Sequence, residues 1–307
     1  MKVYDLEVGW LALADPTAPL SFGGTRITEG VTRDEVVGLA DAMHRKLAVH
    51  SVPVAGAKAG VRTSADEAPE ALAAFADEVR ELLATRVVLG KDMGATNTLI
   101  DGLYASIGLP QLAPVQVRHP GCPDKLRDLA GYRHRMTALG VRWSAEEAYG
   151  ELAGARVAVQ GWGVVGAGSA WRLARAGARV VAASDLDGMC TEVDVDGALG
   201  PRVAPPEALF SVDCDLFVLA AASHTVGADA AEQIRARVVV EGSNFGLRPE
   251  AREVLSRRGI RVVPDVIASS SSAAMVCWQL ATGNGLAEAE LWARIEAAIR
   301  RAASGGV

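Results

Sequence analysis

The chain has 307 residues and a formal net charge of −6, with 31 lysines and arginines against 37 aspartates and glutamates. Such a chain offers no basic field for a phosphate backbone, so a nucleic-acid partner is not expected. Half of the residues are hydrophobic but only 5% are aromatic, which favours an α/β protein with helices packed on a parallel sheet. The length predicts two domains that share a cleft.

The cysteines and the apolar runs exclude further classes of protein. The four cysteines are widely spaced, without a Cys-x-x-Cys pair or a histidine at ligand spacing, so neither a metal site nor a disulfide framework is expected and a cytoplasmic location is predicted. The first ten residues carry acids where a signal peptide needs an apolar run. The apolar run at 216–222 is far too short to span a bilayer, so no membrane partner is expected.

The first half of the chain predicts helices, a strand and a linking segment. A capping box opens each of two predicted helices, over 32–49 and 64–82. The apolar run at 87–89 reads as a strand. The proline-rich segment 109–124 is turn-like and predicts the link between the first domain and the second.

From residue 156 the pattern changes to strand, glycine turn, helix and strand. Strands are predicted at 156–160, 179–183, 215–220, 237–242 and 261–264. The residues from about 273 to 303 read as helices that cross back to the first domain.

The predicted architecture is therefore an N-terminal α/β substrate domain followed by a Rossmann-type dinucleotide-binding domain, with C-terminal helices returning to the first domain. The predicted boundaries are 1–130 for the substrate and oligomerisation domain, 131–275 for the NAD-binding domain and 276–307 for the returning helices.

A GxGxxG turn follows the first of the later strands, with Gly161, Gly163 and Gly166 as its glycines. Such a turn lets the backbone approach a pyrophosphate, whose charge the N-terminus of the next helix favours. Asp185 ends the next strand, 19 positions beyond Gly166, where an acid can hydrogen-bond the ribose 2′-hydroxyl. Because an acid repels a 2′-phosphate and no lysine or arginine is adjacent, NAD is predicted as the cofactor, with NADP as the alternative. A tight turn in another doubly wound domain is the plainer interpretation.

Lys46, Lys58 and Asp92 each lie at the end of a predicted element, beside glycine or a turn, where side chains can reach a cleft. Two clustered lysines ahead of a dinucleotide fold indicate a carbonyl or imine substrate, which one lysine binds and the other activates, since the pKa of a buried lysine near another cation falls readily. Taken singly, each residue is better explained as a solvated surface charge. Their combination favours dehydrogenase chemistry.

The chain resembles the glutamate, leucine, phenylalanine and valine dehydrogenase family, whose pattern is GGTR or GGMR, then MTxK, then GGAK. The motifs that carry the resemblance stand in the family's order: GGTR at 23–26, MHRK at 43–46, AGAK at 55–58, KDMGAT at 91–96, VAVQGWGVVG at 157–166, VVVEGSN at 238–244 and RRGIRVVPDVIA at 257–268. The resemblance implies that Lys46 binds the substrate α-carboxylate, that Lys58 activates the attacking water and that Asp92 passes protons to and from the substrate nitrogen.

The resemblance also implies the binding residues around this catalytic pair. It places Gly23 and Gly24 at the carboxylate site and Asn244 near the nicotinamide ribose. The residues expected to contact the substrate are Phe22, Gly23, Gly24, Met43, Lys46, Gly90 and Val276. The residues expected to contact the cofactor are Gly161, Trp162, Gly163, Val164, Val165, Gly166, Asp185, Ala221, Ala222 and Asn244.

The substrate side chain is predicted to be apolar. Glutamate-specific members resemble one another in having a lysine before the GG pair and a serine on a late helix, whereas this chain has Phe22 and Val276 there. Burying an unpaired carboxylate costs several kcal/mol, so glutamate is disfavoured. Gly90 and Ala273 leave room, so a branched aliphatic or aromatic L-amino acid is expected, with its 2-oxo acid as the other substrate. The alternative is that Phe22 and Val276 are ordinary core residues.

Several positions depart from the family pattern. Serines occupy 269–272 in place of the family's NAGG stretch, Ala130 and the next three residues replace TGYG or TAYG, and His224 stands where asparagine is common. These changes favour a specialised substrate, such as an unusual amino acid or a cyclic imine, or imine reduction as the main activity. A non-catalytic NAD-binding regulatory protein is a further alternative, against which the retention of Lys46, Lys58 and Asp92 argues.

The oligomeric state is expected to be smaller than is usual for the family. Only 22 residues precede the GG pair, whereas the family carries a longer N-terminal segment that helps to build hexamers or octamers. A homodimer is therefore predicted.

Overall fold

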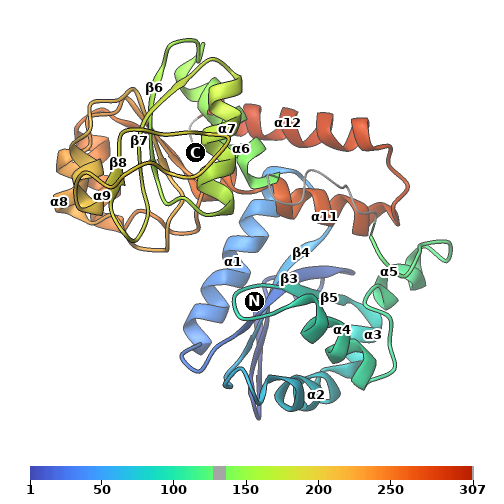
Figure 1. Ribbon diagram of the computed structural model, residues 1–307. Helices are drawn as coiled ribbons and strands as arrows, with labels where there is room; N and C mark the ends of the chain where they lie inside the picture. The colour runs from blue at the N-terminus through green and yellow to red at the C-terminus, as the bar shows by residue number, and fades with distance from the viewer. Residues whose placement is uncertain (127–135, 306–307) are drawn as a thin grey trace. The chain divides into compact units, whose positions relative to one another are not determined.

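The computed structural model describes residues 1–126 and 136–305 (Figure 1). Its internal contacts divide the chain into two compact units. Unit 1 comprises 1–127 and 273–292, and unit 2 comprises 128–272 and 293–307. The predicted α/β class with a Rossmann-type second domain is confirmed.

Unit 1 contains a five-stranded mixed sheet with the strand order β1-β2-β4-β3-β5. The strands are β1 (Lys2–Leu6), β2 (Gly9–Leu13), β3 (Ser21–Ile27), β4 (Ala55–Val61) and β5 (Val87–Lys91). β1, β2 and β4 pair antiparallel, whereas β4, β3 and β5 pair parallel. The helices are α1 (Arg33–Val49), α2 (Ala68–Glu78), α3 (Arg80–Thr85), α4 (Asn97–Ser106), α5 (Ala113–Arg118) and most of α11 (Ser271–Thr282).

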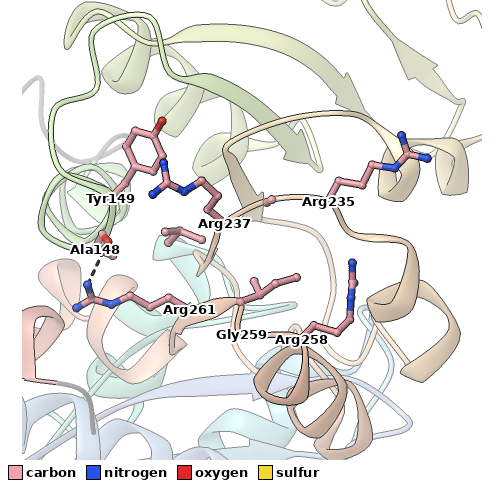
Figure 2. Close-up of a pocket in the computed structure, with 10 residues that line it drawn as sticks. Ala148, Tyr149, Arg235, Arg237, Arg258, Gly259 and Arg261 are labelled. Carbon is pink, nitrogen blue, oxygen red and sulfur yellow. Dashed lines mark hydrogen bonds between the residues drawn. The ribbon is translucent and has the colours of Figure 1, made fainter.

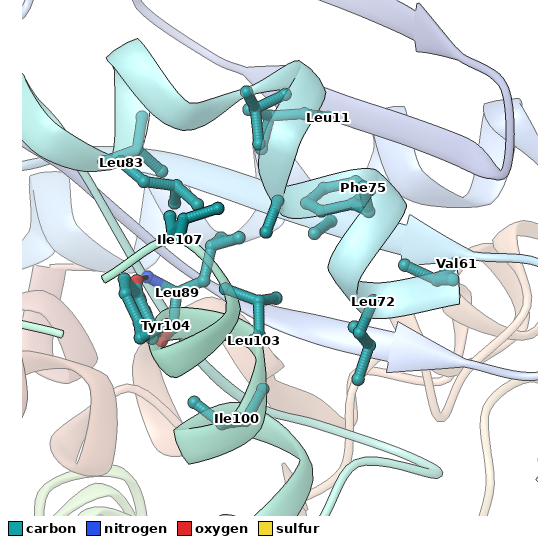
Figure 3. Close-up of a cluster of buried hydrophobic side chains, with 14 of the residues drawn as sticks. Leu11, Val61, Leu72, Phe75, Leu83, Leu89, Ile100, Leu103, Tyr104 and Ile107 are labelled. Atoms are coloured by element: carbon teal, nitrogen blue, oxygen red, sulfur yellow. Dashed lines mark hydrogen bonds between the residues drawn. The ribbon is translucent and has the colours of Figure 1, made fainter. Parts of the chain in front are cut away.

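The two faces of the unit 1 sheet pack against different helices. Alternate residues of a strand point to opposite faces, so Leu11 and Ala57 pack with Phe75 of α2 and Leu103 of α4 in the core drawn in Figure 3. Ala12 packs on the other face with the α1 residue Val36 and its neighbours. Side chains between the core positions of β3, β4 and β5 therefore point toward the α1 face.

Helix α1 begins as its capping box predicts. The Thr32 hydroxyl accepts a hydrogen bond of 3.3 Å from the Glu35 amide, which satisfies one of the free N–H groups of the first turn. The second helix begins later than expected. Ser64 still hydrogen-bonds Glu67, but α2 starts at Ala68 with Pro69 in its first turn, because proline has no N–H and is tolerated only there.

The segment 109–124 is not the loose link that its prolines indicate. It contains the short helix α5, and Leu112, Val115 and Cys122 are buried with Leu47 and Leu280. Pro114 occupies the first turn of α5, where proline favours a helix rather than breaking it.

Unit 2 contains a six-stranded sheet with the strand order β11-β10-β9-β6-β7-β8. The strands are β6 (Arg156–Gln160), β7 (Arg179–Ser184), β8 (Met189–Cys190), β9 (Leu216–Leu219), β10 (Val238–Glu241) and β11 (Arg261–Val263). All pair parallel except β8, which is antiparallel to β7. The helices are α6 (Met136–Tyr149), α7 (Val164–Arg175), α8 (Ala228–Gln233), α9 (Pro249–Arg257), α10 (Asp265–Ala268) and a 3₁₀ turn at Pro206–Ser211.

The end of the chain differs from the expectation that all of 276–307 packs on the first domain. Helix α12 (Glu288–Gly305) contributes its residues from 293 onward to unit 2. Ile295 and Ile299 are fully buried, and Arg300 bridges Glu146 at 2.6 Å and Glu296 at 2.8 Å. These apolar and ionic contacts hold the end of α12 on unit 2. Among the described residues, no helix is both long and apolar enough to cross a membrane.

Candidate active site

Three neighbouring strands of unit 1 bring the predicted catalytic residues together. Lys58 lies on β4 between Ala57 and Ala59, which face the core of Figure 3, so its side chain points to the α1 face. Asp92 directly follows β5 and has the same parity as Gly90 and Val88. The Lys58 Nζ and the Asp92 Oδ2 form an ion pair.

Glycines of β3 allow these side chains to approach the strand. A Cβ added at Gly24 would lie 2.9 Å from the Asp92 Cβ and 3.3 Å from the Lys58 Nζ. At Gly23, a Cβ would lie 1.8 Å from the Ala57 carbonyl oxygen, a distance that no side chain tolerates. Each position of the GG pair therefore requires glycine for a different reason. Gly23 lets two strands pair closely, and Gly24 leaves space for the Lys58 and Asp92 side chains.

Burial and neighbouring charges tune the two catalytic candidates. Lys58 is only 6% exposed, and this burial lowers the pKa of its amine below the ordinary value of 10.5, against the opposing charge of Asp92. Burial raises the pKa of Asp92, but the charges of Lys58 and Arg26 outweigh burial and lower it below the ordinary 3.8. A buried lysine with a lowered pKa therefore contacts a carboxylate whose pKa is also lowered.

Arg26 is a member of this cluster that the sequence interpretation missed. Its guanidinium lies 3.3 Å from the Asp92 Oδ2 and also pairs with Glu35 at the start of α1. The positive charge of Arg26 contributes to lowering the pKa of both Lys58 and Asp92. The signal was present, because Arg26 is the fourth residue of the GGTR motif and has the same strand parity as Gly24.

Lys46 lies in the last turn of α1 and is 8% exposed. Helix α1 packs closely on β4, since a Cβ at Gly56 would lie 2.2 Å from the His44 backbone nitrogen. The Gly56 amide also donates to the His44 Nδ1 at 3.3 Å. The structure thus places the second predicted lysine, buried, on the helix that covers the face to which Lys58 points.

The remaining substrate candidates belong to one apolar cluster of unit 1. Phe22, Met43, Ala273 and Val276 are partly buried and pack against a core that includes Leu47. We call these four residues the Phe22 cluster. A Cβ at Gly90 would lie 3.6 Å from the Phe22 ring, so this glycine borders the cluster. The structure therefore brings together residues that are distant in sequence and that were assigned to substrate binding separately.

The glycine turn of unit 2 has a backbone suited to a pyrophosphate. Gly161 has a φ of 88°, which favours glycine, and a Cβ at Gly166 would lie 1.8 Å from the Gly161 oxygen. At Gly163, the N-cap of α7, no described atom lies within 4 Å of an added Cβ, and no side chain caps the helix. The turn therefore presents free N–H groups and open space to an anion, which fits a dinucleotide cofactor.

Asp185, the acid predicted to bind the ribose, pairs with an arginine that the sequence did not indicate. Asp185 follows β7 and accepts hydrogen bonds from the amides of Asp187 at 3.0 Å and Gly188 at 3.2 Å. Arg202 contacts both carboxylate oxygens, with Nε 3.2 Å from Oδ1 and Nη2 on Oδ2. These hydrogen bonds lower the pKa of Asp185. Asp185 therefore has a basic partner in Arg202, although no lysine or arginine is adjacent to it in the sequence.

The other predicted cofactor residues lie beyond the carboxyl ends of the unit 2 strands, on loops or, for Val164 and Val165, in the first turn of α7. Asn244 follows β10 on a loop fixed at both ends, since the buried Asp265 accepts from the Phe245 amide at 3.1 Å and Glu241 from the Leu247 amide at 2.9 Å. His224 is exposed and stacks on Phe245, with ring centroids 6.0 Å apart. Trp162, Val164 and Val165 follow β6, and Ala221 and Ala222 follow β9.

The serines at 269–272 have backbone partners rather than forming a loose polar turn. The hydroxyls of Ser269, Ser270 and Ser271 each donate 2.7 Å hydrogen bonds, to the carbonyls of Asp265, Ile267 and Met136. All three are buried. The replacement of the family's TGYG turn, at Ala130 and the three residues after it, lies outside the described residues.

Family comparisons agree with this arrangement. Residues 9–106 match the Glu/Leu/Phe/Val dehydrogenase dimerisation domain, and residues 130–198 and 194–281 match the Glutamate/Leucine/Phenylalanine/Valine dehydrogenase domain. The chain belongs to this family. Family membership makes it an oxidoreductase that acts on CH–NH2 donors.

Two kinds of relative illustrate the family membership. The chain is 31% identical over 299 residues to glutamate dehydrogenase B of Halobacterium salinarum, covering 88% of this chain and 68% of that protein. It also resembles hetero-hexameric glutamate dehydrogenase from Thermus thermophilus in its Leu-bound form, with a TM-score of 0.78, 27% identity and coverage of 98% of this chain and 80% of that one.

L-tryptophan dehydrogenase from Nostoc punctiforme shares the fold, with a TM-score of 0.70, 20% identity and coverage of 95% of this chain and 83% of that one. Relatives of the chain include NAD-specific and NADP-specific glutamate dehydrogenases. The cofactor prediction, NAD with NADP as the alternative, agrees with these relatives.

Proposed function

We propose that the chain catalyses the reversible, NAD-dependent oxidative deamination of an apolar L-amino acid to a 2-oxo acid and ammonia. The observation that carries the proposal is the ion pair of the buried Lys58 with Asp92 beside the GG pair, on the same face of the sheet as the Phe22 cluster. A reactive amine, a proton carrier and an apolar surface are the groups that this reaction needs.

The chemistry follows from the states of the two charged groups. Lys46 holds the substrate α-carboxylate, and Asp92 accepts a proton from the substrate ammonium so that its nitrogen can form an imine. NAD, when bound, supplies the acceptor for the hydride that leaves the substrate Cα. Lys58 in its neutral form takes a proton from the water that attacks the iminium carbon. Asp92 then returns its proton to the nitrogen of the resulting carbinolamine. The carbon–nitrogen bond breaks as the hydroxyl oxygen forms the carbonyl of the 2-oxo acid, and the departing ammonia takes up the hydroxyl proton and leaves as ammonium.

The proposed preference for an apolar side chain rests on the Phe22 cluster. Phe22, Met43, Ala273 and Val276 offer no positive charge to a second carboxylate, and an unpaired buried carboxylate loses several kcal/mol of hydration. The named relatives include many glutamate dehydrogenases, so this preference is where the chain is proposed to differ from them.

Steady-state kinetics test the substrate directly. The rate of NADH formation is measured with leucine, phenylalanine, tryptophan and glutamate at matched concentrations. We expect kcat/KM for the best apolar substrate to exceed that for glutamate at least 100-fold, since that ratio corresponds to only about 3 kcal/mol. A higher kcat/KM for glutamate would refute the assignment of the Phe22 cluster.

We also propose that the protein is a homodimer. The match of residues 9–106 to a dimerisation domain supports self-association. Light scattering on the purified protein should give twice the mass of one chain. A hexamer would contradict the dimer while leaving the catalytic proposal intact.

A further inference from the structure

A second charged site lies in unit 2, at the edge of the sheet opposite the glycine turn. The glycine turn follows the last residue of β6, whereas this hollow of about 470 Å³ lies where β10 and β11 begin. Arg235, Arg237, Arg258, Arg261 and Tyr149 line it, and we call it the arginine hollow (Figure 2). Its position separates it from the cofactor residues.

The charge of the arginine hollow contrasts with that of the chain. The chain has a net charge of −6, yet no aspartate or glutamate lines the hollow. Within 1–126 and 136–305, the side chains of Arg235, Arg237 and Arg261 form no ion pair with a carboxylate, and Arg258 has only Glu232 at 4.0 Å. Like charges gathered without counter-charges repel one another, so a bound anion would reduce the repulsion within the cluster.

Part of the cluster is held in place by helix ends. Arg261 donates to the Ala148 carbonyl at 3.1 Å, as Figure 2 shows, and also to the Ala303 carbonyl, while Arg258 donates to the Ala231 carbonyl. Arginine often compensates such helix C-termini, which accounts for these two residues. Each guanidinium has five N–H donors, so both retain donors after these contacts.

Helix capping does not account for the other two arginines. Arg237 packs over the Tyr149 ring with its guanidinium carbon 5.4 Å from the ring centroid, as Figure 2 shows. Among the described residues, the Arg235 and Arg237 side chains donate no hydrogen bond. Their full sets of donors are therefore available to a ligand, on a hollow whose other arginines are already fixed.

We propose that the arginine hollow binds a small anion that carries at least two phosphate groups, at a site distinct from the cofactor. Planar guanidinium groups match pairs of phosphate oxygens, and the volume lies within the range of small-molecule sites. Phosphate is favoured over a single carboxylate because four arginines line one hollow. The site is independent of the amino acid substrate and offers a place for regulation by a phosphorylated metabolite.

Isothermal titration calorimetry with pyrophosphate tests the site. The full chain is saturated with NADH, which blocks the glycine turn, before pyrophosphate is added. We expect saturable binding of one pyrophosphate per chain, at least tenfold weaker in the double variant Arg235→Ala/Arg237→Ala. Arg175→Ala is the matched control, because this exposed arginine of unit 2 pairs with Asp196 and does not line the hollow, and its affinity for pyrophosphate should equal that of the wild type.

Further titrations identify the chemical class of the ligand, and a single variant controls for a folding defect in the double variant. ATP should bind and adenosine should not; tighter binding of ATP than of pyrophosphate assigns the site to nucleotides rather than to the inorganic anion. The single variant Arg235→Ala removes an exposed side chain and should also weaken binding. No saturable binding to the wild type, equal affinity in Arg235→Ala, or loss of binding on adding NADH would each overturn the proposal.

Discussion

Replacing Arg26 by glutamine tests how the buried lysine of the proposed active site is kept reactive. Arg26 and Lys58 contact the same oxygen of Asp92, so each positive charge disfavours the other. Removing the guanidinium therefore stabilises the protonated form of Lys58. The pKa of Lys58 should therefore rise toward its ordinary value of 10.5, and the pKa of Asp92 should rise as well.

The size of the effect follows from the geometry. Two nitrogens that contact one oxygen are at most about 6 Å apart, twice a hydrogen-bond length, so the estimate for this separation is a lower bound. At an effective dielectric constant of about 20, two unit charges at this separation repel each other by about 3 kcal/mol. Water that enters the space left by the guanidinium screens part of this interaction, so the pKa of Lys58 should rise by less than the full interaction implies.

The pH dependence of kcat/KM for deamination measures this shift. Activity should increase with pH as Lys58 loses its proton, and the midpoint of that increase should move to higher pH in Arg26→Gln. Arg33→Gln is the control, because Arg33 is exposed and pairs with Asp5 away from the site, and its profile should match the wild type. An unchanged midpoint in Arg26→Gln, or a shift to lower pH, would refute the electrostatic reasoning.

Three further predictions concern the substrate, the glycine pair and the cofactor. Phe22→Lys places a cation in the Phe22 cluster and should raise kcat/KM for glutamate at least tenfold relative to leucine; an unchanged ratio would show that Phe22 does not face the substrate. Gly24→Ala crowds Lys58 and Asp92 and should lower kcat at least tenfold with little change in Tm, whereas Gly30→Ala, in open space, should leave kcat unchanged. Fluorescence titration should show that Arg202→Ala weakens NADPH binding more than NADH binding and that Asp185→Ala strengthens NADPH binding; equal effects on both cofactors would exclude the pair from cofactor selection.

The sequence predicted those parts of the fold that depend on local pattern. The capping box of α1 and the five parallel strands of unit 2 are all short-range signals, and the structure confirms them. The start of α2 was misplaced because Pro69 overrides the capping pair that precedes it. The division of α12 between the units was missed, since one amphipathic helix pattern does not say which partner each turn packs against.

In the candidate site too, local motifs predicted some residues, whereas contacts that depend on the tertiary fold were missed. Lys58 and Asp92 were predicted from motifs, and the structure places them in contact. Arg26 and Arg202 were missed because ion pairs with Asp92 and Asp185 depend on strand pairing and loop return, not on neighbouring positions in the chain. Strand parity could have found Arg26, whereas nothing local indicates Arg202, 17 positions beyond its partner.

Turnover by Lys58→Ala tests the central claim most directly. The variant is supplied with NAD and the best apolar amino acid, and NADH formation is followed by its absorbance while NADH binding is measured separately by fluorescence. We expect a loss of kcat of at least 1,000-fold, within the contribution of a general acid or base, with the affinity for NADH unchanged. Retention of most of the wild-type activity would contradict the role of Lys58 and the mechanism built on it.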